Sequence, residues 1–187
     1  MQKLIAFENL SLDGYYVDRK GEMTWAKDDN DAEFNAFASE NAQGEGTMVF
    51  GRVTYDLMAS FWPTPQARQL LPVVAERMNG ARKLVFSRTL SQAPWNNTTV
   101  LKGDLVAEIR RLKHEPGQGL VILGSGSLVA QLAPHGVIDE YQLILNPTAL
   151  GAGRTLFDGV NERLNLKLTN SRVFKNGKVF LAYAPVT

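Results

Sequence analysis

Short apolar runs, each bounded by polar residues or glycine, recur along the first two-thirds of the chain. They occupy residues 4–7, 48–50, 83–86 and 120–123. Their shortness and their β-branched and aromatic side chains are typical of strands that are buried on both faces of a sheet. The pattern therefore predicts a set of buried strands spaced along the chain.

Segments between and after these runs carry apolar residues at helical spacing. In one of them Leu105, Ile109 and Leu112 fall on a single helix face, and Asp104 can cap the helix start. Strands that alternate with helices predict a mostly parallel sheet covered on both faces. The predicted helices span residues 31–42, 104–113 and 126–132.

The tail of the chain has a different pattern. Apolar and polar residues alternate over residues 141–146 and again over 164–169. Asn176-Gly177 then separates a segment ending at Val173 from an apolar run over 179–183. Asn-Gly is the strongest short hairpin signal, because both positions of that turn need positive φ. We therefore predict a mixed α/β architecture in which a parallel sheet ends in an antiparallel C-terminal hairpin.

Composition is that of one ordinary globular domain, which we place over residues 1–187. Hydrophobic residues make up 44% of the chain and charged residues 21%, which argues against disorder. The formal net charge of +1 gives no strong field to attract nucleic acid or an anionic membrane. We therefore expect a small-molecule ligand and neither a nucleic-acid nor a membrane partner.

Several kinds of chemistry have no residues to support them. The chain has no cysteine, which excludes disulfides, thiolate zinc sites and a cysteine nucleophile. Its two histidines, His114 and His135, have no metal-ligand spacing, and no serine-hydrolase motif is present. We expect no bound metal. The apolar N-terminal stretch is too short for a signal peptide and no apolar run could span a membrane, so we expect a cytoplasmic protein.

The segment Gly124-Ser125-Gly126-Ser127-Leu128 directly follows the run 120–123. A glycine turn lets backbone approach a ligand closely, and the helix after it directs N–H groups and partial positive charge at the ligand. This geometry suits a pyrophosphate. The structural alternative is a tight strand-to-helix turn capped by Ser127, and the sixth position of a G-x-G-x-x-G motif is valine here.

A second strand ends in the same way at Gly51. Arg52 and Thr54 follow it and offer a cation and a hydroxyl to phosphate oxygens. The alternative is an ordinary helix start with a solvated arginine.

A third strand ends at Ser87 and Arg88. An arginine beside hydroxyls at the carboxyl end of a strand can hold the 2′-phosphate that distinguishes NADP from NAD, although an exposed loop arginine is the alternative. The turns after all three strands share one property, because open α/β sheets bind ligands at the carboxyl ends of their strands.

Two carboxylates are candidates for a catalytic role. Asp13 lies in Ser11-Leu12-Asp13-Gly14-Tyr15, where Asp-Gly favours a turn, so it is either a site residue or a turn former. Glu33 lies one helical turn before Phe37 and can border the apolar face of its helix; burial would raise its pKa and let it supply a proton. Its neighbours Asp28, Asp29 and Asp31 are expected to face water.

Taken together, these segments resemble the dihydrofolate-reductase-like superfamily. The branch they resemble most is the C-terminal reductase domain of the bifunctional riboflavin-biosynthesis deaminase–reductase, with its stand-alone relatives. The matching segments occur in family order over nearly the whole chain. They are residues 11–15, 51–55, 87–88, 124–128 and 147–157.

The resemblance implies a three-layer α/β/α fold, NADPH as the hydride donor and a homodimer. It assigns residues 51, 52 and 54 to the cofactor phosphates, residues 87–88 to the 2′-phosphate side, and residues 124–128 to the pyrophosphate and nicotinamide side. It makes the segment around Asp13 the flexible loop over the nicotinamide, and it puts Glu33 nearest the acidic residue that contacts the pterin in dihydrofolate reductases. The implied cofactor-binding residues are Gly51, Arg52, Thr54, Ser87, Arg88, Gly124, Ser125, Gly126, Ser127 and Leu128.

The resulting hypothesis is an NADPH-dependent reductase that passes a hydride to a pteridine-like or pyrimidine-ribosylamine substrate. The rival hypothesis is an NADP-binding module or sensor of the same fold that lacks catalytic turnover.

Overall fold

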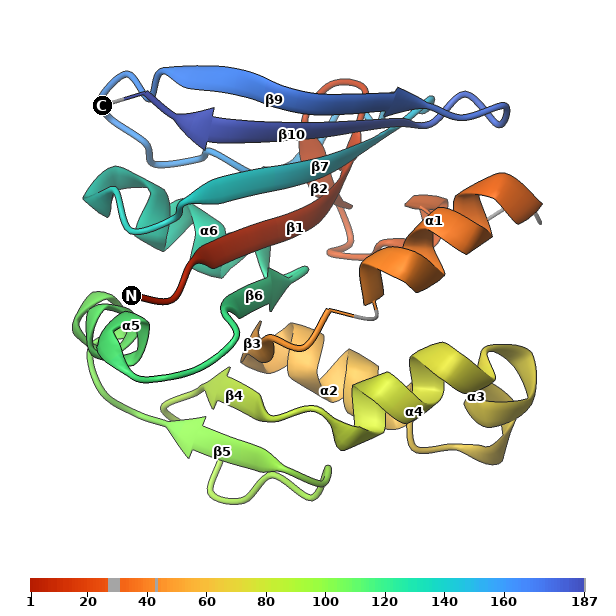
Figure 1. Cartoon of the computed structure of the whole chain (residues 1–187). Helices are drawn as coiled ribbons and strands as arrows, with labels where there is room; N and C mark the ends of the chain where they lie inside the picture. The colour runs from red at the N-terminus through yellow and green to blue at the C-terminus, as the bar shows by residue number, and fades with distance from the viewer. Residues whose placement is uncertain (27–30, 43, 187) are drawn as a thin grey trace.

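The computed structural model describes residues 1–26, 31–42 and 44–186, so the predicted solvent-facing Asp28 and Asp29 lie outside the described residues. In this part of the chain an eight-stranded sheet has the order β5-β4-β3-β6-β1-β7-β10-β9 (Figure 1). Neighbouring strands from β5 to β7 are parallel, whereas β10 is antiparallel to both β7 and β9. The strands are β1 (Leu4–Ser11), β3 (Thr47–Gly51), β4 (Lys83–Phe86), β5 (Thr98–Leu101), β6 (Leu120–Leu123), β7 (Glu140–Asn146), β9 (Leu166–Val173) and β10 (Val179–Pro185).

Helices cover both faces of this sheet. On one face α5 and α6 pack against the central strands, and on the other face α1, α2 and α4 do so. This arrangement is the predicted three-layer α/β/α fold, closed by the predicted antiparallel C-terminal strands. The helices are α1 (Ala32–Ala42), α2 (Arg52–Phe61), α3 (Pro65–Leu70), α4 (Pro72–Gly80), α5 (Leu105–His114) and α6 (Gly126–Leu132), with short 3₁₀ turns η1 (Thr24–Ala26) and η2 (Ala133–His135).

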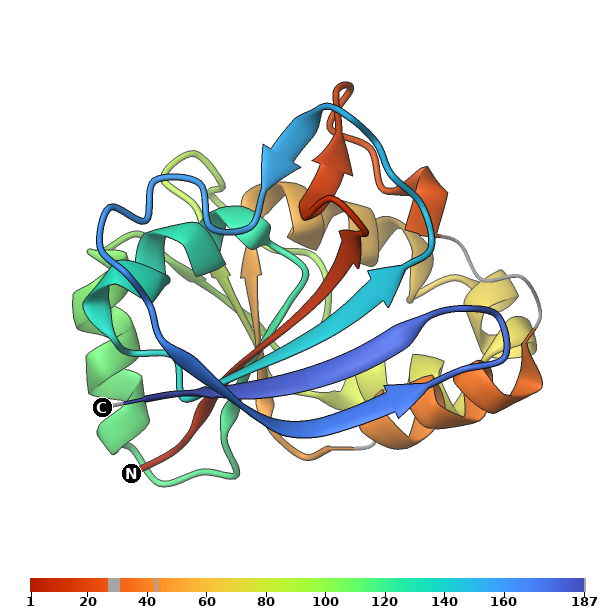
Figure 2. The same cartoon turned by 90° about the horizontal axis from the view of Figure 1, so that it is seen from above.

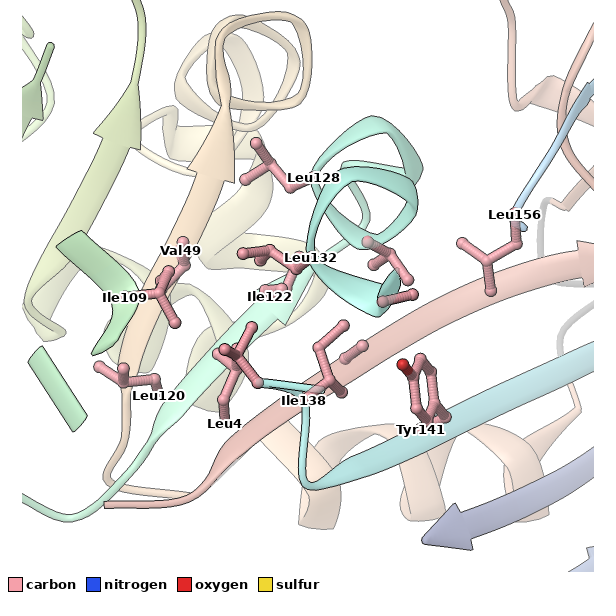
Figure 3. Packing of buried hydrophobic residues seen from close by; sticks show 14 of the residues in the cluster. Leu4, Val49, Ile109, Leu120, Ile122, Leu128, Leu132, Ile138, Tyr141 and Leu156 are labelled. Atoms are coloured by element: carbon pink, nitrogen blue, oxygen red, sulfur yellow. The ribbon is translucent and has the colours of Figure 1, made fainter. Parts of the chain in front are cut away.

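The largest part of the core lies between the sheet and the α5–α6 layer. Figure 3 shows Leu132 of α6 against Ile122 of β6 and Ile109 of α5 beside Val49 of β3, and all four side chains are fully buried. Asp104 caps α5 by accepting a hydrogen bond from the Ala107 N–H at 2.8 Å, as its position before the apolar periodicity predicts. The helical spacing of apolar residues on α5 and α6, together with the central position of β6 in the sheet, therefore determines how this layer packs.

A two-stranded ribbon lies beyond the main sheet. It pairs β2 (Tyr15–Asp18) with β8 (Gly153–Thr155) in antiparallel fashion. Figure 2 shows this ribbon projecting past the carboxyl ends of β1 and β7. The ribbon therefore stands at the edge of the sheet where the phosphate-suited turns are expected.

The C-terminal hairpin has a different turn from the predicted one. Only Gly177 has positive φ (82°), and Asn176 does not. The Gly177 N–H bonds the Phe174 carbonyl at 3.0 Å, and the Phe174 N–H bonds the Lys178 carbonyl at 2.9 Å. The loop is thus one residue longer than a two-residue Asn-Gly turn and needs left-handed backbone only at glycine.

The alternating segment over residues 164–169 and the segment ending at Val173 form one continuous strand, β9, which begins at Leu166. It lies at the edge of the sheet, and its side chains are almost all exposed. The apolar alternation therefore marked a strand, but this strand has no fully buried face.

Candidate functional site

The sheet topology brings the phosphate-suited turns together. The strands β4, β3 and β6 are adjacent and parallel, and they end at Phe86, Gly51 and Leu123. Residues 51–54, 87–89 and 124–128, here called the strand-end turns, therefore lie side by side at one edge of the sheet. The sequence-based prediction that these turns share an edge is confirmed.

Direct contacts join the first and third of these turns. The Gly51 N–H donates a hydrogen bond of 2.8 Å to Oγ of the buried Ser125. A Cβ added at Gly124 would lie 3.2 Å from Cγ2 of Thr54. Gly124 therefore has two reasons to be glycine, a tight neighbour and a φ of +60°.

Arg52 joins the first turn to the second. Its Nη1 donates to Oγ1 of Thr89 at 2.9 Å, and its Nε donates to the Asp56 carboxylate at 2.6 Å. These hydrogen bonds hold the guanidinium in place. The Arg52 side chain is 43% exposed, so it remains accessible to a ligand. An arginine fixed in this way suits phosphate oxygens, because its planar fork is already oriented.

Two of the helices that begin at this edge, α2 and α6, lack a side-chain cap, whereas Asp104 caps α5. Gly51, which precedes α2, has no side chain, and the Ser125 side chain does not cap α6. Ser125 also has φ of +67° in the left-handed region, which is unusual for a residue other than glycine. The initial N–H groups and the positive ends of two helix dipoles thus face the same edge, an arrangement that favours anions.

Ser87 and Arg88 have different situations. Ser87 is buried, and its hydroxyl accepts hydrogen bonds from the N–H groups of Thr89 (3.3 Å) and Leu90 (3.0 Å). Arg88 is exposed and makes no hydrogen bond or ion pair with the described residues. Ser87 therefore shapes its turn, whereas Arg88 is available to a ligand.

A groove of about 520 Å³ lies beside the strand-end turns. It extends past β5, a strand that the sequence analysis missed because Thr98 and Thr99 interrupt its apolar character. The end of this strand adds Lys102, a cation that only the β4–β5 pairing could have revealed. Ser127 is exposed and does not line the groove. The lining residues are Phe86, Ser87, Arg88, Leu101, Lys102, Gly103, Asp104, Leu105, Val106, Leu128, Gln131 and His135.

Asp13 ties its loop to the segment before β8. Its carboxylate accepts hydrogen bonds from Ser11 Oγ at 2.6 Å and from the Gly151 N–H at 2.8 Å, and the Leu150 N–H also points at it. The bond from Ser11, together with those backbone bonds, lowers the pKa of Asp13 to about 2. Asp13 is therefore ionised near neutral pH and acts as an acceptor that orders the loop.

Glu33 lies at the other end of the sheet from β5. Its Oε1 accepts a hydrogen bond of 3.1 Å from Arg172 of the edge strand β9. The next residue, Phe34, packs edge-on against Phe174 with ring centroids 5.1 Å apart. The structure thus places Glu33 on the β9 side of α1 and gives it no contact with the strand-end turns.

Other kinds of site lack support in residues 1–26, 31–42 and 44–186. These residues contain no group of three or more histidine, aspartate or glutamate side chains that could hold a metal ion. Over the same residues, the helices are all too short or too polar to cross a membrane.

Comparisons with known proteins agree with this geometry. The chain is 30% identical over 174 residues to the uncharacterised protein YyaP of Bacillus subtilis, covering 93% of this chain and 90% of that protein. A putative riboflavin biosynthesis protein of Shewanella sp. PV-4 matches with a TM-score of 0.76 and 25% identity over the whole of both chains. Dihydrofolate reductase of Enterococcus faecalis, in complex with NADP(H), matches with a TM-score of 0.66 and 17% identity, covering 99% of this chain and 97% of the reductase chain.

A family model also matches this chain. The model of the RibD C-terminal domain matches residues 2–180, which is nearly the whole chain. The order of strands and the position of the strand-end turns agree with the resemblance seen in the sequence. This chain therefore belongs to the RibD C-terminal domain family.

Proposed function

We propose that this protein is an NADPH-dependent reductase of the riboflavin-biosynthesis and dihydrofolate-reductase type. The observation that carries the proposal is the convergence of the strand-end turns, joined by the Gly51–Ser125 and Arg52–Thr89 hydrogen bonds. Membership of the RibD C-terminal domain family and the likeness to a reductase complexed with NADP(H) support it.

The residues at this edge fit a phosphorylated dinucleotide. The starts of α2 and α6, with Arg52 and Thr54, would hold its phosphates, because uncapped helix starts and a fixed guanidinium favour anions. Arg88 and Lys102 line the adjoining groove and would hold the 2′-phosphate. When bound, the dinucleotide supplies a hydride, and the protein supplies orientation.

The substrate we propose is a pteridine-like or pyrimidine-ribosylamine compound. Glu33 remains the proposed proton donor, and it would have to exchange its Arg172 contact for the substrate. Asp13, ionised near neutral pH, would act by ordering the loop over the reacting groups. We also propose a homodimer, which the exposed edge strand β9 would allow, and its mass in solution by light scattering tests this.

Calorimetric titration with NADPH tests the cofactor assignment. We expect saturable binding, and we expect Arg88→Ala to raise the Kd for NADPH by about tenfold to a hundredfold, because a hydrogen bond to a charged group contributes about 1.5–3 kcal/mol. The same substitution should leave NADH binding unchanged, since NADH lacks the 2′-phosphate. Arg110→Ala, at an exposed position on α5, is the matched control. Absence of NADPH binding would contradict the proposal.

Turnover separates the reductase from a binding protein without catalysis. NADPH oxidation is followed by the loss of NADPH absorbance with a panel of pteridines and pyrimidine-ribosylamines. Oxidation with one compound, lost in Glu33→Gln while NADPH binding persists, supports the enzyme. Binding without oxidation on any compound supports the NADP-binding module.

A further inference from the structure

Glu8 is a buried acid with no partner. It lies on β1 between the neighbouring strands β6 and β7 and is only 1% exposed. Its side chain shares the face of β1 that carries Leu4, Ala6 and Leu10, which packs into the core. Among the described residues, no group forms a hydrogen bond with either carboxyl oxygen.

An unpaired buried carboxylate is unfavourable, so this group holds its proton. Burial raises the pKa of the Glu8 carboxyl well above its ordinary value of 4.5. An apolar side chain of similar size would fit the same surroundings without this penalty. The carboxyl group therefore lowers the stability of the fold relative to an apolar side chain. A functional role for it would have to act through the groups that lie next to it.

Glu8 borders the glycine turn. Phe7 pairs with Leu123, and the Gly124 N–H donates a hydrogen bond of 3.0 Å to the Phe7 carbonyl. Glu8, the next residue of β1, therefore lies next to the start of the turn. Tyr16 of β2 lies against the same turn. A Cβ added at Gly126 would lie only 2.6 Å from ring atoms of Tyr16.

Few titratable or charged side chains lie near Glu8. Tyr16 is buried, and burial raises the pKa of its phenol; Arg154 opposes this, whereas Glu8 and Asp158 add to it. The Arg154 guanidinium lies 5.4 Å from the centre of the Tyr16 ring and makes no ion pair with Glu8. On β7, the neighbouring buried group is Tyr141, and the segment 124–128 contributes no charged side chain. Among the described residues, Glu8 therefore has no ion-pair partner to compensate a charge on its carboxylate.

We propose that Glu8 is a positioning residue for the dinucleotide site, which acts through Tyr16 and the Gly124–Gly126 turn. While Glu8 is uncharged, Tyr16 packs directly on Gly126 and the turn keeps its shape beside Gly51. When Glu8 loses its proton, the charge must gain water or a cation, which requires Tyr16 and the turn to separate. Dinucleotide affinity therefore falls as Glu8 ionises. This inference rests on the proposed NADPH function.

The test is the pH dependence of NADPH binding in wild type and Glu8→Gln, with Glu8→Leu as a second uncharged variant. As pH is raised from about 7, where the 2′-phosphate is mostly ionised, we expect the wild-type Kd to rise by about tenfold more than that of either variant, because Glu8 ionises as pH rises through its raised pKa. The same pH dependence of the Kd for NADPH in all three proteins would overturn the inference and leave the NADPH proposal intact.

Thermal unfolding without ligand separates the two proposals. Because the pKa of Glu8 is raised in the folded state, its contribution to stability is full below its ordinary value of 4.5 and is lost as pH rises toward the folded pKa. Glu8→Gln should therefore exceed wild type in Tm at pH 8, and the gain should shrink toward pH 4.5. No NADPH binding in any variant, with this Tm pattern present, would sink the reductase proposal and with it the positioning role.

Discussion

The strand-end turns and Glu33 were both predicted to carry function, and the structure gives them different kinds of contact. The strand-end turns meet through backbone and hydroxyl groups, as in the Gly51–Ser125 hydrogen bond of 2.8 Å. The α1–β9 contact, formed by Glu33 and Arg172, joins two long side chains that are 36% and 43% exposed. The first region is fixed by the path of the chain, whereas the second depends on rotamers that a ligand can change.

Gly126 offers the strongest way to break the strand-end turns. Gly126→Val introduces a Cβ where ring atoms of Tyr16 lie 2.6 Å away, so β2 or the turn must move. We expect a loss of about 1–3 kcal/mol in the free energy of unfolding and a rise of at least about a hundredfold in the Kd for NADPH. Denaturant unfolding and calorimetry measure the two effects. Gly80→Ala, where an added Cβ meets nothing within 4 Å, should change neither.

Ser125 separates backbone strain from hydrogen bonding in the same region. Ser125→Ala removes the acceptor of the Gly51 N–H and keeps a Cβ at φ of +67°, so we expect a loss of about 1–2 kcal/mol in stability. Ser125→Gly also removes the acceptor but relieves the left-handed strain, so it should be about 1 kcal/mol more stable than Ser125→Ala. Equal stabilities in the two variants would contradict this account.

Asp13 tests whether its loop belongs with the ordered region. Because hydrogen bonds lower the pKa of Asp13 from 3.8 to about 2, its contribution to stability is present above its ordinary pKa and is lost as pH falls through the folded value. Asp13→Asn should therefore lower Tm at pH 6, and the difference from wild type should diminish between about pH 4 and about pH 2. A difference that stays constant with pH would show that the carboxylate charge has no part in it.

Glu33 should give the smallest effect on stability. The ion pair with Arg172 is solvent-exposed, and such pairs contribute about 0–1 kcal/mol. Glu33→Gln should change the free energy of unfolding by less than about 0.5 kcal/mol, with Arg172→Gln as its partner control. A large loss of stability would mean that Glu33 is structural, and the difference between the two regions would then disappear.

The sequence by itself indicated the buried strands β1, β3, β4 and β6, the helix start at Asp104 and the places where strands run into glycine. These features are local: they follow from apolar spacing, capping residues and turn residues, which a linear reading can find. It also identified the segments that resemble a reductase family, and the family match over residues 2–180 confirms them.

Only the tertiary structure decided which partners each side chain has. Ser125 meets Gly51 across 74 positions of sequence, and Glu33 meets Arg172 across 139. Glu8 lies among apolar residues of β1, and only the fold shows that, within the part of the chain that the structure describes, no group bonds its oxygens. Such contacts depend on strand order and side-chain direction in space, and no local pattern in the chain records them.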